Sequence, residues 1–432
     1  MHKEMGRSPG HDGKSHLETA YFRLLKDELL LALGCTEPIA IAYASARCRR
    51  LLGQEPESMT IACSGNIIKN VKSVIIPTTG NMRGIETAAI LGAIAGDDSL
   101  GMEVLSKVTA EDVERTARLK EAGLCKAEYL ESASNLHIIV RQQAGEYCAM
   151  VEVANQHLNV VREEINGFVL VHEKRNPSQE QPEGWMTLQG ILQFADDAPI
   201  ETLRDVLRDQ MENNLAIAKE GLRGHYGAQV GKTMLWQGDQ SPRALAMAHA
   251  AAGSDARMGG CAMPVVVNSG SGNQGMTVSL PVVVYAQARG MSDEKMFRAL
   301  ALSNLLALYQ KSLIGKLSAY CGVVSAGCAS VAAIAYLEDA DLSVIEGTII
   351  NMLGTIAGMV CDGAKASCAA KIVAALQTGF LAYDMARAGH VFHSGDGLIK
   401  QDADHTIYAV GRMGKEGMRS TDTEILRIMM QP

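Results

Sequence analysis

The first strong pattern along the chain is helical. Apolar side chains recur every three or four residues over 16–32, which predicts an amphipathic helix that ends at Gly34. The apolar positions of this helix are Tyr21, Leu24, Leu25, Leu29 and Ala32. The preceding segment, residues 1–15, is polar and contains glycine, so we expect a disordered tail there.

A second helix is expected directly after Gly34. Pro38 suits the first turn of a helix, and IAIAYASARCRRLL continues a helical pattern behind it. Cys35 is therefore expected at a helix–helix junction, near the positive N-terminal end of the second helix. Such a position lowers the pKa of a thiol and favours the thiolate. Glu37 beside it is either an ordinary acid of the first helical turn or a partner for a substrate amine.

Short apolar runs then indicate β-structure. Residues 58–63 and 71–77 are predicted as strands, and so are the four runs HIIVRQQ, YCAMVEV, HLNVVREE and FVLVHE within 100–180. The polar turns between these four runs lie at Ala144–Gly145, Asn155–Gln156 and Asn166–Gly167. Asn-Gly between apolar runs is a strong hairpin signal. We expect this part of the chain to form an α+β lobe.

The second half of the chain has a mostly helical pattern. NPSQEQPEG at 176–184 is typical of a linker, and a loop rich in Gly, Ser and Asn interrupts the helices at 267–276. The segment VSLPVVVYAQA after that loop fits a helix or a strand. We therefore predict an α+β fold with a mostly helical C-terminal catalytic region and a smaller β-containing lobe in the N-terminal half. The expected segments are the tail 1–15, a mixed segment 16–99 with the CTEP motif, the α+β lobe 100–180 and a helical cluster-binding region 185–432.

Composition removes several classes of function. A chain of 432 residues is long enough for two or three lobes, and its net charge of −8 gives no reason to expect a nucleic-acid partner. No basic segment followed by an apolar core marks a signal peptide, so we expect a cytoplasmic protein with reduced cysteines. The uncharged stretch 317–337 is rich in Ala, Ser and Gly, which favours a buried helix over a membrane span.

Three cysteines in the last third of the chain are candidate metal ligands. Cys321 lies in YCGVVSAGC, and Cys361 and Cys368 lie in CDGAKASC. Three thiolates can hold an iron–sulfur cluster and leave one iron open to substrate. On one regular helix Cys361 and Cys368 would be about 10 Å apart, which is wide for one cluster. Because Asp362-Gly363 breaks the pattern, we expect Cys361 in a loop and Cys368 in the first turn of the next helix. The alternative is that all three are small buried apolar residues.

Three polar segments are candidate binding loops for an anion. In NSGSGNQG (268–275), backbone N–H groups can converge on a carboxylate or phosphate, and Ser271, Asn273 and Gln274 add hydrogen-bonding side chains. PTTGNMRG (77–84) precedes a helix and can also hold an anion. SGNIIKN (64–70) supplies Lys69 and Asn66. The alternatives are a flexible linker for the first loop and an ordinary helix cap or turn for the other two.

Seven motifs together resemble one family. They are GCTEPIAIAYA, SGNIIKN, PTTGNMRG, NSGSGNQG, CGVVSAGC, CDGAKASC and GMRSTDTEIL. In this order they resemble the PLP-independent L-cysteine desulfidase family, which is related to the α-chain of iron–sulfur L-serine dehydratases. The resemblance runs from about Glu28 to the C-terminus. The second cysteine of the cluster motif is followed here by Asp-Gly, where the serine dehydratase relatives have Asp-Pro.

The resemblance implies a cofactor and a reaction. A [4Fe-4S] cluster would be held by Cys321, Cys361 and Cys368, without PLP, and Cys35 would act in catalysis. The implied reaction is β-elimination of L-cysteine to pyruvate, ammonia and hydrogen sulfide, with the open iron as Lewis acid. L-Serine dehydration by the same chemistry and a non-catalytic iron–sulfur redox sensor remain as alternatives. Cys35 would remove the Cα proton as a thiolate, or would cap the open iron at rest.

The same resemblance implies where the substrate binds. The two glycine-rich loops would hold the α-carboxylate of a small amino acid, with Lys69 or Asn81 assisting. The implied substrate-binding residues are Lys69, Thr79, Gly80, Asn81, Ser271, Asn273 and Gln274. No nucleic acid or membrane partner is expected, and a homodimer is compatible with the sequence.

Overall fold

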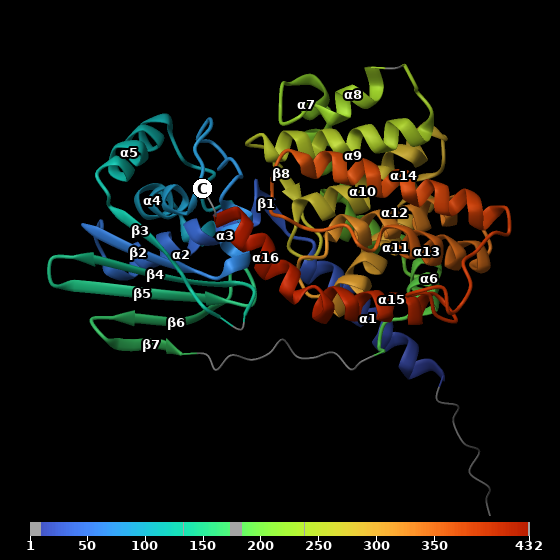
Figure 1. Cartoon of the computed structure of the whole chain (residues 1–432), viewed down its shortest axis with the longest axis horizontal. Helices are drawn as coiled ribbons and strands as arrows, with labels where there is room; N and C mark the ends of the chain where they lie inside the picture. The colour runs from blue at the N-terminus through green and yellow to red at the C-terminus, as the bar shows by residue number, and fades with distance from the viewer. Residues whose placement is uncertain (1–9, 133, 173–183, 237, 431–432) are drawn as a thin grey trace, which may run out of the picture.

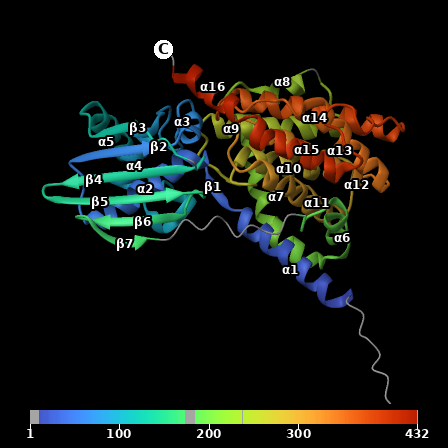
Figure 2. The same cartoon turned by 60° about the horizontal axis from the view of Figure 1, so that its bottom comes forward.

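The computed structural model describes residues 10–132, 134–172, 184–236 and 238–430. A sheet-containing lobe and a larger helical region lie side by side in both views (Figure 1, Figure 2). This arrangement confirms the predicted α+β class, with a mostly helical C-terminal region and a smaller β-containing lobe in the N-terminal half. The C-terminal helix α16 (Arg419–Met430) leaves the helical region and packs on α3 (Gly65–Val71) of the sheet lobe.

The sheet lobe is built on a six-stranded sheet of order β3-β2-β4-β5-β6-β7. Strand β2 runs parallel to β3, and the other neighbouring strands are antiparallel. Because β2 lies inside the sheet, the segments before and after residue 99 share one lobe. Its strands are β2 (Ser58–Cys63), β3 (Cys125–Tyr129), β4 (His137–Ala144), β5 (Tyr147–Ala154), β6 (Val160–Ile165) and β7 (Phe168–His172). Its other elements are α2 (Thr36–Leu52), α3, α4 (Ile85–Ala95), η1 (Asp98–Glu103) and α5 (Ala110–Glu121).

The core of this lobe lies between the sheet and the helices α2 and α4. Helix α2 packs on β4 and β5, and α4 packs on β2 and β3. The inward side chains Ile61, Val140 and Val151 are completely buried there. The predicted hairpin at Asn166–Gly167 is confirmed, because both residues have positive φ and join β6 to β7. Strand β6 begins at Val160, later than the expected start at 157.

The helical region surrounds a second core of small and aliphatic side chains. Helix α12 (Gly322–Leu337) is almost wholly buried between its neighbours, which confirms a buried helix in the uncharged stretch 317–337. Along the described parts of the chain, no helix combines the length and apolarity needed to cross a bilayer. The remaining elements are α6 (Leu188–Asp197), α7 (Ile200–Arg223), α8 (Val230–Trp236), α9 (Pro242–Met258), β8 (Pro264–Val266), α10 (Gly272–Ala288), α11 (Asp293–Ile314), α13 (Leu342–Ile356), α14 (Ser367–Arg387), α15 (Ala403–Arg412) and η2 (Met413–Gly417).

The N-terminal helix differs from the prediction at both ends. Helix α1 (Gly10–Glu28) begins inside the segment expected to be disordered, whose residues 1–9 lie outside the described part. Leu31–Leu33 is a short strand, β1, which pairs antiparallel with β8. Tertiary pairing overrides the helical pattern here because Ala32 and Leu33 are buried against β8. Cys35 therefore follows a strand, and the predicted helix–helix junction is wrong.

The predicted strand at 71–77 is also wrong. Helix α3 continues to Val71, and the chain after it is irregular apart from a single bridge between Ile75 and Arg83. The segment 71–77 is apolar because Val74 and Ile76 are completely buried, although they form no hydrogen-bonded strand ladder. The segment VSLPVVVYAQA is helical in α10. The expected linker at 176–184 lies outside the described residues except for Gly184.

Candidate active site

The cysteine motifs meet at the side of the helical region that faces the sheet lobe. Cys321 is the N-cap residue of α12. A bridge between Tyr320 and Val360 places the two cysteine segments side by side: Cys321 N donates to Met359 O at 3.0 Å, and Cys361 N donates to Ala319 O at 2.6 Å. Cys361 lies in a loop and Cys368 in the first turn of α14, which confirms both predicted positions.

The three thiols interact electrostatically. Burial and, more weakly, the neighbouring Cys361 together raise the pKa of Cys321 to about 12. The pKa of Cys368 is raised by burial and, more weakly, by Cys361. Three thiols held this close give up their protons readily only if a cation or metal compensates the charge.

A buried lysine provides part of that compensation. Lys311 on α11 is 3% exposed, and its ammonium forms no hydrogen bond or ion pair with any described residue. Burial lowers its pKa to about 8, while Cys361 and Cys321 act in the opposite direction. Lys371 on α14 is close to the same two thiols and pairs with Asp362. These cations favour an anionic thiolate-bound group at this place.

The residues fit an iron–sulfur cluster better than a single metal ion. Within the described ranges, no three His, Cys, Asp or Glu side chains come together as a site for one ion. A cluster of four irons is wider than one ion, so its thiolate ligands stand farther apart. Three cysteines with cations beside them suit a cluster that leaves one iron open to substrate. Cys321, Cys361 and Cys368 would hold it.

Gly363 fits the cysteine loop tightly against the sheet lobe. Its φ of +94° is a conformation that side chains rarely adopt, and a Cβ there would lie 2.3 Å from Lys69 O of α3. Gly363→Ala should therefore lower the free energy of unfolding by about 1–3 kcal/mol and reduce iron incorporation. Urea unfolding and iron analysis after anaerobic reconstitution measure both effects. Gly358→Ala is the matched control, because a Cβ there meets no atom within 4 Å; equal behaviour of the two variants would contradict the tight fit.

Cys35, the predicted catalytic residue, is brought to the cluster cysteines. It is the N-cap residue of α2, is 2% exposed, and packs with Val74, Met258 and Cys368 in one small apolar cluster. The predicted thiolate is wrong for this structure, however. Burial raises the thiol pKa well above its ordinary value, and the Glu37 carboxylate raises it further. Desolvation outweighs the helix N-terminus, so Cys35 carries its proton.

Glu37 is a buried, fully engaged carboxylate. Cys35 Sγ and Thr36 Oγ1 each donate to Glu37 Oε2 at 3.1 Å, and Asn70 Nδ2 of α3 donates to Glu37 Oε1 at 3.1 Å. Thr36 Oγ1 also lies 2.9 Å from the carbonyl oxygen of Gly270, in the other lobe. Glu37 therefore organises the contact between α2, α3 and the glycine-rich loop, which is more than a first-turn acid does.

The loop 268–275 lies against this group of residues. Ser271 caps α10, where its hydroxyl accepts from Gln274 N at 3.4 Å. Asn273 and Gln274 are buried, and their side-chain oxygens have no hydrogen-bond partner in the described structure. Gln274 packs on Gly322, the residue after Cys321, where a Cβ would lie 2.4 Å from Gln274 Cδ. The structure thus brings the predicted loop to the cluster cysteines with hydrogen-bonding capacity unused.

The TTGN loop is less connected to the cysteines. Thr79 is buried, but its hydroxyl donates to Ile76 O at 2.7 Å within its own turn. Gly80 and Asn81 are exposed, and their side of the loop contacts neither cysteine segment through any described hydrogen bond. The described contacts of this loop are structural, since Pro77 packs on Gly34 beside Cys35.

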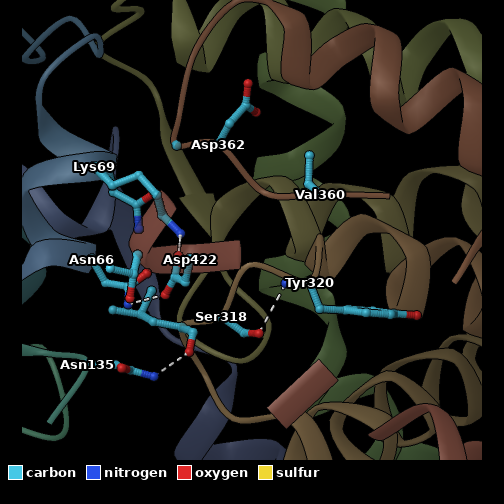
Figure 3. A network of polar contacts seen from close by, with 12 residues as sticks. Asn66, Lys69, Asn135, Ser318, Tyr320, Val360, Asp362 and Asp422 are labelled. Carbon is cyan, nitrogen blue, oxygen red and sulfur yellow. Dashed lines mark hydrogen bonds and ion pairs between the residues drawn. The ribbon is translucent and has the colours of Figure 1, made fainter. Parts of the chain in front are cut away.

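Lys69 lies at the other side of the site. It is 1% exposed and forms an ion pair with Asp422 of α16, to which Asn66 Nδ2 also donates at 2.7 Å. Figure 3 shows the Lys69 and Asn66 side chains both directed at the Asp422 carboxylate. These residues line a cavity of about 560 Å³ between the lobes, together with Ser318 and Ala319 next to the cysteine segment.

Some residues of the site give no signal in the sequence. His157 was expected within a strand, but it lies in the turn between β5 and β6 and reaches the other lobe. Its ring is buried against Gly270, where a Cβ would lie 2.9 Å from His157 Cε1, and its Nε2 has no partner among the described residues. Burial lowers its pKa, which keeps the imidazole neutral. Arg257 and Lys311 were missed as well: Arg257 Nε donates to Gly34 O at 3.0 Å beside Cys35, and Lys311 lies near Cys321 and Cys361. Asp422 lies in the GMRSTDTEIL motif, but no role was assigned to it.

Comparison with known proteins places these motifs in a family. The family described as serine dehydratase alpha chain matches residues 99–427, which include all three cluster cysteines. A UPF0597 protein of Lachnoclostridium phytofermentans is 49% identical over 409 residues, covering 94% of this chain and 98% of that protein. UPF0597 proteins of Finegoldia magna and Treponema denticola are 45% and 42% identical, covering 95% of this chain and 99% and 97% of theirs. The chain therefore belongs to the serine dehydratase alpha chain family.

Proposed function

We propose that the protein is an iron–sulfur lyase that eliminates sulfide from L-cysteine to give pyruvate and ammonia. The observation that carries the proposal is the meeting of Cys321, Cys361 and Cys368 with Cys35 in an inter-lobe site. Membership of the serine dehydratase alpha chain family supports the lyase class and an iron–sulfur cofactor. When bound, a [4Fe-4S] cluster supplies a Lewis-acidic iron for the leaving group.

His157 is the base that we assign to the Cα proton. Burial favours its neutral ring, its Nε2 has no hydrogen-bond partner among the described residues, and it lies against Gly270 of the glycine-rich loop. A base must have a free lone pair and a pKa below the working pH to accept a proton repeatedly. Cys35 does not meet this requirement, because its thiol retains its proton.

Cys35 instead acts as a proton donor. Its thiol is held toward Glu37 at 3.1 Å and packs beside Cys368. The Cα–H bond breaks as His157 takes the proton, the electron pair forms the Cα–Cβ double bond, and the Cβ–S bond breaks. The Cys35 thiol protonates the departing sulfur, and solvent restores both side chains. Water then hydrolyses the released aminoacrylate to pyruvate and ammonia.

L-Serine is the second candidate substrate, and the family match favours it specifically. The chemistry is the same, with hydroxide as the leaving group. The two candidates are separated by assaying anaerobically reconstituted protein with each amino acid for pyruvate, ammonia and sulfide. Equal amounts of sulfide and pyruvate from L-cysteine support the desulfidase. Pyruvate from L-serine alone establishes a dehydratase, and a brown protein that forms no product favours the redox-sensor alternative.

An open iron requires a reducing compartment, so we propose a cytoplasmic location.

Cys35→Ala should keep the cluster and slow turnover. The three cluster cysteines are untouched, whereas loss of the proton donor should lower kcat by about a hundredfold, because water replaces it only in part. Steady-state kinetics and iron content on the same preparation measure the two effects. Cys63→Ala removes another completely buried thiol, from the end of β2, and should change neither. If Cys35→Ala protein lost its iron, Cys35 would be a ligand rather than a proton donor.

A further inference from the structure

The buried pair between Lys69 and Asp422 has no evident structural purpose. Lys69 lies on α3 and Asp422 on the C-terminal helix, and their side chains are 1% and 17% exposed. Removing two charges from water costs about as much free energy as their attraction returns, so a buried pair is weak evidence for stability. Both charged residues line the wall of the inter-lobe cavity, where a charged ligand can reach them.

Asn66 adds an unused acceptor beside the pair. Asn66 is 8% exposed, and its Nδ2 donates to Asp422 Oδ2 at 2.7 Å. This bond fixes the amide orientation, because the reversed amide would direct its oxygen at the carboxylate. The other atom, Oδ1, is buried and has no hydrogen-bond partner among the described residues. A buried acceptor without a donor requires an explanation, and a bound donor supplies one.

The charges of this wall match those of an amino acid. An α-ammonium group offers three N–H donors, and Asp422 with Asn66 Oδ1 offers a charged and a neutral acceptor. Lys69 offers a cation for the α-carboxylate.

We propose that Asp422 and Asn66 bind the α-ammonium group of the substrate, beside Lys69, for which the family resemblance already implies a role at the α-carboxylate. The zwitterion replaces each half of the resting ion pair, so every buried charge stays compensated before and after binding. The cavity continues to Ser318 and Ala319, and Ala319 O accepts from Cys361 N. Figure 3 shows Ser318 hydrogen-bonded to Tyr320, the residue before Cys321, with Val360, the residue before Cys361, close by. This assignment rests on the proposed function only for the identity of the substrate.

The test compares two ligands that differ at one group and have no leaving group. L-Alanine carries the ammonium, and L-lactate carries a hydroxyl in its place. Calorimetry on anaerobically reconstituted protein should show L-alanine binding more tightly than L-lactate. Asp422→Asn should weaken L-alanine about 30-fold or more and leave L-lactate within about twofold. Glu424→Gln is the matched control on the same helix, because Glu424 pairs only with Arg427 at the surface; it should change neither affinity.

Asn66→Ala is the second variant, since it removes the acceptor without leaving Lys69 unpaired. It should weaken L-alanine about fivefold or more and not L-lactate, by loss of one hydrogen bond to a charged group. Equal weakening of both ligands, unchanged L-alanine affinity in both variants, or no L-alanine binding by the unaltered protein would overturn the assignment. L-Alanine binding through Asp422 without turnover of L-cysteine or L-serine would reject the lyase and keep the subsite. Full turnover by Asp422→Asn would reject the subsite and keep the lyase.

Discussion

Replacing Cys361 by serine should abolish both cluster assembly and turnover. Cys361 connects the other two proposed ligands, because its loop is bridged to the Cys321 segment and its thiol acts on both Cys321 and Cys368. A cluster with two thiolate corners and a neutral hydroxyl is lost readily. We expect no visible iron–sulfur absorbance and no pyruvate from L-cysteine or L-serine after anaerobic reconstitution.

The fold should survive this substitution. Cys361 is half-buried in a loop at the edge of the helical core, and serine is close to cysteine in size, so the circular dichroism spectrum and the unfolding midpoint should remain close to those of the unaltered protein. Cys148→Ser, at an exposed thiol of β5, is the control and should keep cluster and activity. If Cys361→Ser protein retained iron and sulfide at the level of this control, the three-cysteine cluster would be refuted. The three cysteines would then be ordinary buried residues without a ligand role.

Sequence reasoning succeeds here where local chemistry decides the structure. Asp362-Gly363 breaks the helix between two cysteines, and the loop and helix positions of Cys361 and Cys368 follow from that break. Asn166–Gly167 sets a hairpin in the same local way. The sequence indicated only that the motifs of Gln274 and Gly322 share a function. It did not predict that the two residues touch, because no local rule relates segments so far apart along the chain.

Sequence reasoning fails where the packing of the two lobes against each other determines the structure of the site. The helix N-terminus at Cys35 predicts a lowered pKa, but burial beside Glu37 reverses the direction, and burial is a property of the assembled site. His157 was expected in a strand, and Asp422 lies in the GMRSTDTEIL motif without an assigned role. They become part of the site only because the turn reaches Gly270 and the helix packs on α3.

His157→Gln should lower kcat by about 10²–10⁴-fold, the usual contribution of a general base. Glutamine keeps hydrogen-bonding atoms and similar size but cannot accept the Cα proton. Because His157 is not among the cysteine ligands, iron and sulfide content should be unchanged. His249→Gln is the control: its pKa is also lowered by burial, but its ring bonds to Leu245 O within α9.

The pH dependence of kcat/KM separates a base from a merely structural histidine. The neutral imidazole is the active form, and burial lowers its pKa from the ordinary value of 6.5. Activity should therefore rise with pH through a value below 6.5 and be lost as the pH falls through it. In His157→Gln this acid limb should disappear from the residual activity, while in His249→Gln it should remain. An acid limb that persists unchanged in His157→Gln would show that another group removes the Cα proton, because the titrating residue would still be present.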